Sequence, residues 1–226
     1  GTDNRIVNNL GEGIRALSGG VALEGSGRIE DNGGWGIRAD GGSIAVVPGA
    51  AYSVTANGAG GLFAGDGLNL PAGISVEENG GPGIVVWSSD DTRLEGVRVR
   101  RNRGVGIGIV VTGASRERRD RGLVLEGEGN QIVDNGGGGI VAASGSVTIL
   151  GDTEIRGNAG WGILAEDGSV SIAEKAMDAL RENGGGGVFA GSTLSLPSGF
   201  LVEENGGPGI VVRGDQDTEL WDVSVR

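Results

Sequence analysis

Two adjacent carboxylates, Asp90 and Asp91, are the first residues of this chain to consider for chemistry. The segment "SSDDT" around them, and "GDQDT" with Asp215 and Asp217, could supply an acid and a base or oxygen ligands for a cation. Aspartate and serine also favour turns, where their side chains bond to nearby backbone groups. Because both segments stand between predicted strands, we interpret them as turns. We assign no catalytic residue and no metal ligand.

Histidine and cysteine are absent from the 226 residues. Their absence removes the most common general base near neutral pH and the thiolate metal ligands. The formal net charge is −12, so we expect no general attraction to nucleic acid or anionic lipid. No apolar run approaches the roughly 20 residues that cross a bilayer. We therefore predict no membrane span, and we predict no cofactor.

Two tryptophans occupy equivalent places, Trp35 in "NGGWGI" and Trp161 in "NAGWGI". A partly exposed indole can stack on a sugar ring or a protein partner, and repeated placement suits a long polymer. The alternative is that each indole covers the glycine-rich turns beside it, because large aromatic side chains are stabilised chiefly by burial. Trp35 and Trp161 are therefore candidate binding residues with a structural alternative.

Arginines form a second group of candidates, since nine of the seventeen fall within residues 93–121. In "GVRVRRNRG" the alternation points Arg98 and Arg100 outward, and "SRERRDR" places Arg118 and Arg119 in an expected loop. Together they could form a basic patch for an anionic polysaccharide or lipopolysaccharide, because arginine makes bidentate contacts with anions. The alternative is a solvated loop of mixed charge, since acidic residues interrupt the run.

The elements that would position these side chains are indicated by a motif repeated nine times. The motif is an aliphatic residue, two residues, asparagine, three residues, glycine and an aliphatic residue. Its asparagines are Asn9, Asn32, Asn57, Asn79, Asn102, Asn135, Asn158, Asn183 and Asn205. They are spaced by 23, 25, 22, 23, 33, 23, 25 and 22 residues. A repeat of this length is typical of a solenoid coil.

Within one repeat, apolar residues alternate in three short runs separated by glycine or asparagine turns. In the second repeat these runs contain Ile37 with Ala39, Ile44 with Val46, and Tyr52 with Val54. Such alternation indicates three short strands with one side facing a core. The fold class is therefore all-β, and we predict a parallel β-helix of about nine to ten coils with three strands per coil.

The asparagines are predicted to form a structural ladder along the turns. One asparagine per coil can bond to its neighbours and to turn backbone that no strand satisfies. The glycines beside it are expected to accommodate left-handed or crowded backbone angles. We favour this structural role over a catalytic one because buried polar groups need partners.

An outward-facing stripe is expected to follow these turns, one residue per coil. Its members are Arg15, Arg38, Phe63 and Val85 in the first half of the chain and Val141, Leu164, Phe189 and Val211 in the second. Four stacked apolar side chains are disfavoured by water and often mark an interface. The expected partner is another β-helix or a covering segment; the alternative is that a neighbouring loop already covers the stripe.

The chain is also a tandem duplication. Shifted by 126 positions, residues 2–100 match residues 128–226 without a gap, with 50 of 99 positions identical. The stretch "VEENGGPGIVV" occurs unchanged at 76–86 and 202–212. We predict one β-helix domain over 1–226, with a five-coil unit at 1–126 and a truncated second unit at 127–226. We expect this to be a fragment of a longer array, because open solenoid ends expose strand edges.

The motifs "NGGWGI", "NGGPGI" and "NGGGGI" in coils of 22 to 25 residues resemble the right-handed parallel β-helix repeats of the pectin-lyase-like superfamily. That superfamily includes polysaccharide lyases, hydrolases and epimerases as well as large secreted surface proteins. The resemblance therefore implies a fold rather than a function. The histidine motifs of its polygalacturonase and epimerase branches are ruled out here, since histidine is absent.

Our interpretation is a non-enzymatic β-helix of a bacterial secreted or cell-surface protein, acting as a rigid, adhesin-like spacer and interaction surface. Its expected partners are an extracellular polysaccharide, another surface protein, or further copies associated end to end or side by side. The alternative is a polysaccharide-active enzyme whose catalytic elements lie outside this fragment or are not recognised. The nearly uniform coil length favours the first reading, because enzymes of this fold usually carry long and dissimilar loops over one sheet.

Overall fold

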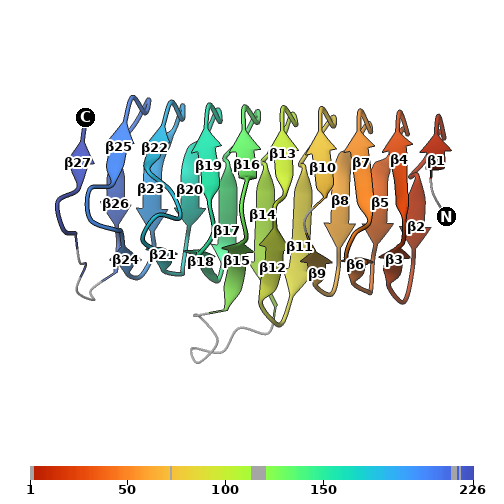
Figure 1. Ribbon diagram of the computed structural model, residues 1–226, viewed down its shortest axis with the longest axis horizontal. Coiled ribbons are helices and arrows are strands. Elements are labelled where there is room, and N and C mark those ends of the chain that lie inside the picture. The colour runs from red at the N-terminus through yellow and green to blue at the C-terminus, as the bar shows by residue number, and fades with distance from the viewer. Residues whose placement is uncertain (1–2, 72, 113–120, 215–217, 219) are drawn as a thin grey trace.

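The computed structural model describes residues 3–71, 73–112, 121–214, 218 and 220–226. All regular secondary structure in these residues is β-strand, and the strands stack into one elongated tube with β1 and β27 at opposite ends (Figure 1). None of the described residues forms a helix long and apolar enough to cross a membrane. The predicted all-β class is confirmed.

Three parallel sheets, here called sheets A, B and C, form the walls of the tube. Sheet A contains β1 (Asn4–Val7), β4 (Ser26–Glu30), β7 (Ala51–Thr55), β10 (Ile74–Glu77), β13 (Arg98–Arg100), β16 (Asn130–Val133), β19 (Thr153–Arg156), β22 (Ala179–Arg181), β25 (Leu201–Glu203) and β27 (Ser224–Val225). Sheet B contains β2 (Ile14–Ala16), β5 (Trp35–Ala39), β8 (Gly60–Ala64), β11 (Ile84–Ser88), β14 (Ile107–Val111), β17 (Ile140–Ser144), β20 (Trp161–Ala165), β23 (Gly186–Ala190) and β26 (Ile210–Val212). Sheet C contains β3 (Val21–Leu23), β6 (Ile44–Val46), β9 (Leu68–Leu70), β12 (Thr92–Glu95), β15 (Gly122–Glu126), β18 (Ser146–Ile149), β21 (Val170–Ile172) and β24 (Leu194–Ser195).

Each of the first eight coils supplies one strand to each sheet, and each strand inside a sheet pairs with its counterparts one coil before and one coil after. In sheet B, for example, Ile84 is in register with Leu62 of the previous coil and Ile107 of the next. Coils stacked at about 4.8 Å give a tube of about 40 Å. The predicted three strands per coil and roughly nine coils are confirmed.

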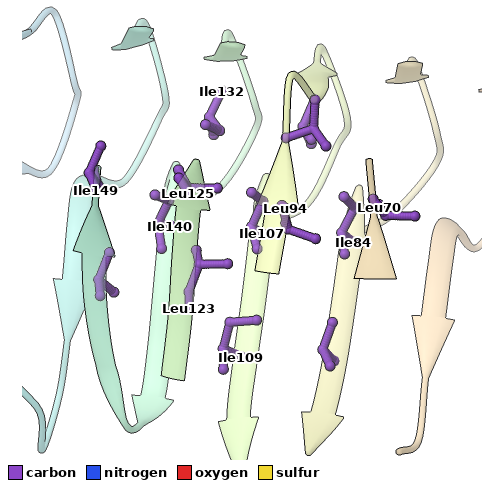
Figure 2. Packing of buried hydrophobic residues seen from close by; sticks show 14 of the residues in the cluster. Leu70, Ile84, Leu94, Ile107, Ile109, Leu123, Leu125, Ile132, Ile140 and Ile149 are labelled. Carbon is purple, nitrogen blue, oxygen red and sulfur yellow. The ribbon is translucent and has the colours of Figure 1, made fainter. Parts of the chain in front are cut away.

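The core is a set of aliphatic ladders inside the tube. Leu94 and Leu125 of sheet C and Ile107 and Ile140 of sheet B point into the interior from facing walls (Figure 2). Each is at most 1% exposed, and the same pattern recurs from coil to coil. The period-two alternation read from the sequence therefore marks the residues that face the core.

The backbone of each asparagine turn reverses through one left-handed residue, which stands directly before the asparagine. Its φ lies between 53° and 66° in all nine coils, and it is glycine only at Gly157. We had expected left-handed angles at the glycines beside the asparagine. The structure instead places the left-handed angle on the residue before the asparagine, and the glycines that follow it do not adopt one. A left-handed non-glycine residue such as Ala56 costs on the order of 1 kcal/mol, so other interactions in the turn must offset it.

Close packing explains the invariant glycine four residues after each asparagine. A Cβ at Gly36 would collide with the inward Val54 and lie 2.9 Å from the amide nitrogen of Asn57. The same clash with the next asparagine recurs at Gly106 and Gly139, each 2.9 Å from it. These glycines satisfy the predicted crowding rather than a special φ angle.

Candidate interaction surface on sheet B

The nine asparagines form one continuous hydrogen-bonded ladder along the turns between sheets A and B. In each coil, the backbone N–H and the side-chain Nδ2 both donate to Oδ1 of the next asparagine. The Nδ2 to Oδ1 distances range from 2.8 to 3.2 Å. The backbone N to Oδ1 distances range from 3.0 to 3.2 Å.

The ladder also satisfies backbone carbonyls at the ends of sheet A. Nδ2 of Asn158, for example, donates to the carbonyl of Ile132 at 3.0 Å, and Asn158 is 1% exposed. Up to three such hydrogen bonds per coil, each worth about 1 kcal/mol, outweigh the cost of the left-handed residue. The ladder thus holds each turn in one geometry. This geometry fixes where each strand of sheet B begins, and so it positions the side chains of that strand.

Sheet B carries a row of side chains on its outer surface, which we call the outer column. It contains Arg15, Arg38, Phe63, Val85, Gly108, Val141, Leu164, Phe189 and Val211, one from each coil and all in register. All are half-buried except the exposed Arg15. The sequence-predicted stripe is therefore one continuous row, in which Gly108 joins the two halves.

Aromatic side chains gather on the first half of this face. Trp35 and Phe63 meet edge to face with ring centroids 5.7 Å apart, and Trp87 makes the same contact on the other side of Phe63 at 5.7 Å. The guanidinium of Arg38 lies over the Phe63 ring at 5.2 Å. Trp35 covers Gly60, where a Cβ would come within 2.5 Å of the indole. We call Trp35, Arg38, Phe63 and Trp87 the first cluster.

The second half repeats the arrangement with two residues exchanged. Trp161 and Phe189 meet edge to face at 5.8 Å, and Trp161 covers Gly186 in the way that Trp35 covers Gly60. Here the cation over the phenyl ring is Arg213, at 5.9 Å. Leu164 takes the place of Arg38. We call Trp161, Leu164, Phe189 and Arg213 the second cluster.

The geometry confirms the covering role of the two tryptophans, and their role in binding stays a prediction. Trp35 and Trp161 do cover glycine-rich backbone, yet both stay only half-buried. Trp87, which the sequence analysis did not single out, is 47% exposed. Trp87 and Arg213 stand two residues after the outer column, so the same alternation, followed one step further, would have revealed them.

The charges around the two clusters are already paired. Asp40 accepts hydrogen bonds from Arg38 and from Arg15, the latter at 3.1 Å. The hydrogen bond from Arg38 is the main reason that the pKa of Asp40 lies below its usual value, with desolvation opposing it and Arg15 adding to it. Arg213 pairs with Asp167 at 3.1 Å. Arg15, Arg38 and Arg213 therefore each have a carboxylate partner.

The described arginines of residues 93–121 lie on more than one wall of the tube, since Arg93 is on β12 of sheet C. Arg98 and Arg100 both lie on β13 of sheet A, where Arg100 pairs with Glu77 at 2.9 Å and Arg98 has no ion pair among the described residues. Arg118 and Arg119 lie outside the described residues. A basic patch that unites all four stays a prediction.

Burial and hydrogen bonding act in opposite directions on Glu77, the acidic partner of Arg100. Desolvation raises its pKa, but hydrogen bonds from Ser75 and Arg100 and the nearby charge of Arg101 more than offset this, so the pKa lies below its usual value. Glu77 is therefore ionised near neutral pH and is bound to two arginines.

Asp90 and Asp91 lie in the turn between β11 and β12 and are used by that turn. The backbone N–H of Asp90 donates to Ser88, its carboxylate pairs with Arg121, and Asp91 accepts a hydrogen bond from the N–H of Gly122 at 3.1 Å. Asp215 and Asp217 lie outside the described residues. Within the described part of the chain, no group of three or more acidic residues is placed to hold a metal ion.

Comparison with known proteins gives one match. A family model described as the right-handed β-helix region matches residues 1–177, which is more than half of the chain. Searches of curated proteins and of solved structures found no match. The family match confirms the right-handed parallel β-helix that the resemblance to the pectin-lyase-like superfamily implied.

Proposed function

The chain belongs to the right-handed β-helix family, and on that premise we propose that it is a non-enzymatic, rigid spacer whose sheet B is an interaction face. We place it in a bacterial secreted or cell-surface protein, where such a spacer acts in an adhesin-like way. The extracellular location is supported by the resemblance of the repeat to large secreted surface proteins.

The observation that carries the proposal is the composition of sheet B. Seven consecutive strands, from β8 to β26, contain no charged residue. Their outward side chains include Phe63, Leu164 and Phe189, all half-buried. Soluble proteins rarely leave a long apolar face without a partner.

The other two walls differ in a way that singles out sheet B. Seven of the ten strands of sheet A contain charged residues, several of them in ion pairs between coils. The outward positions of sheet C are mostly small or polar, such as Asn69, Thr148 and Ser171. Sheet B is therefore the wall best suited to contact another molecule.

Rigidity is supported by the way neighbouring coils are joined. Three ladders of backbone hydrogen bonds and one of asparagines connect each coil to the next. A coil cannot bend away from its neighbour without breaking several of these bonds at once. The tube is thus suited to hold attached parts of a protein at a fixed separation of about 40 Å.

A polysaccharide-active enzyme is the competing function. The described carboxylates Asp90, Asp91 and Glu77 are engaged in turns or ion pairs, and this favours a non-catalytic chain. Half-exposed tryptophans beside phenylalanine and arginine still suit a sugar ring, so a glycan is a second candidate partner on the same face.

One experiment tests both readings. The purified chain is incubated with acidic and neutral polysaccharides, with and without calcium, while binding and product formation are followed separately. We expect no cleaved or epimerised sugar. If a polysaccharide binds, Trp161→Ala should weaken it while Trp221→Ala, an exposed tryptophan outside both clusters, should not. Turnover of any polysaccharide would overturn the non-enzymatic proposal.

A further inference from the structure

We infer that the partner of sheet B is a second copy of this chain, packed face to face with its coils running in the opposite direction. This inference rests on the proposed function, since it names the molecule that the interaction face binds. It is built from the order of residues along the face, the placement of charge and the area available.

The order of residues along the face makes it able to pair with itself. The two clusters lie five coils apart, with Phe63 and Phe189 in equivalent positions. A two-fold axis between Gly108 and Val141 exchanges them, so the first cluster of one copy meets the second cluster of the other. An isologous contact of this kind uses both clusters twice and closes as a dimer.

Charge placement agrees with the antiparallel direction. Charged residues directly follow three described strands of sheet B, at equivalent places in their coils: Asp40 after β5, Glu166 after β20 and Arg213 after β26. Reversing the second copy places the carboxylate of Asp40 opposite the guanidinium of Arg213. Opposite charges at the rim of an interface fix its register and direction.

A parallel arrangement would place tryptophan rings against carboxylates. With both tubes running the same way, a two-fold axis along the tube would place Trp35 against Asp40 of the second copy and Trp161 against its Glu166. An indole that covers a carboxylate removes the carboxylate from water without giving it a partner. The antiparallel arrangement leaves only one carboxylate in this position, Glu166 opposite Trp87. It gives Asp40 a cation in Arg213, and it pairs Phe63 with Phe189 and Val85 with Leu164.

The size of the face fits a weak, reversible dimer. Five-residue strands at about 3.3 Å per residue, stacked over about 40 Å, give roughly 650 Å² for each copy. The two copies together would bury about 1,300 Å², which is at the lower end of specific interfaces. We therefore expect a monomer–dimer equilibrium that depends on protein concentration.

Sedimentation equilibrium of Val141→Arg tests the face. Arginine already occupies the outer column at Arg15 and Arg38, so this position should accept it without loss of the fold. Two introduced arginines would face each other near the two-fold axis, and we expect the dissociation constant to rise at least about tenfold. The matched control is Thr148→Arg, because Thr148 points outward on sheet C. It should change the dissociation constant of the dimer by less than about twofold.

Disulfide trapping tests the direction, because the chain has no cysteine of its own. Val141→Cys lies beside the inferred axis and should form an intermolecular disulfide on oxidation. Val211→Cys lies at the end of the face and should not. Disulfides in both variants would show a parallel dimer and overturn the antiparallel inference.

A failure of this inference can be told apart from a failure of the proposed function. A chain that stays monomeric at all concentrations overturns the self-association, whatever the polysaccharide experiment shows. A chain that dimerises equally well as Val141→Arg also overturns it, since the contact then lies on another wall. Only turnover of a polysaccharide contradicts the non-enzymatic role.

Discussion

The side-chain amide of Asn102 donates a hydrogen bond of 3.1 Å to Oδ1 of Asn135, although 33 residues separate the two. The spacing is ten residues longer than in the preceding coil. The distance nevertheless matches those in the other coils, so the extra length is accommodated after β14 and does not disturb the turn. The ladder therefore continues unchanged through the longest coil.

Replacing a ladder asparagine should destabilise the tube. Asn158→Ala removes two donors and an acceptor at a site that is 1% exposed. We expect a loss of about 1–3 kcal/mol, because backbone groups of the neighbouring coils lose their partners. Asn69→Ala, an exposed asparagine on β9, is the control. Equal urea midpoints for the two variants would contradict a structural ladder.

Adding one methyl group at a turn glycine should also be costly. Gly36→Ala places a Cβ against Val54 and 2.9 Å from the amide of Asn57, and overpacking of this kind costs about 1–3 kcal/mol. Gly11→Ala meets no atom within 4 Å and should leave thermal stability unchanged. A melting temperature of Gly36→Ala that equals that of Gly11→Ala would show that the turn can relax.

The two clusters should tolerate an exchange of their variable residues. Arg38→Leu together with Trp87→Arg converts the first cluster to the composition of the second, which keeps a phenylalanine under an arginine. We expect stability within about 0.5 kcal/mol of the parent. Arg38→Leu alone leaves Phe63 without its cation and serves as the comparison. A larger loss in the double variant than in the single one would show that the clusters are not equivalent.

Acid should remove the contribution of Glu77. Its pKa in the folded chain lies below the ordinary 4.5, so its ion pairs stabilise the fold above that pH. This contribution is lost as the pH falls through the lowered pKa. Glu77→Gln should therefore lower the thermal midpoint at pH 7 and have little effect near pH 2. Glu203→Gln, the equivalent position in the second half, controls for the loss of a charge on sheet A. A deficit in Glu77→Gln that persists at pH 2 would contradict the assignment.

The fold could be read from the sequence because one physical requirement repeats in every coil. Ile37, Ile84 and Ile163 are apolar since each faces the same closed interior, and glycine and asparagine recur because the turn beside them is crowded. The left-handed residue was not foreseen. Its identity varies from Ala56 to Arg101, and the angle is imposed by the ladder rather than by the residue that adopts it.

The candidate surface could be predicted in part. Alternation places Phe63 and Phe189 outward, and the structure shows them in one row of sheet B. Alternation extended by two residues also places Trp87 and Arg213 outward, but it does not show that each contacts a phenylalanine of the neighbouring coil. Contacts between coils depend on which residues share a register, and a single coil of sequence does not contain that information.

The direction of the hydrogen bonds in this tube has a mechanical consequence. Strands run around the tube, so the bonds that join coils lie along its axis and would be loaded directly by a pull on the two ends. Such bonds break one row at a time. Each coil that unfolds would release 22 to 33 residues, or roughly 70–120 Å of chain at full extension. Stretched in this way, the protein would lengthen in a series of similar steps and absorb work at each one.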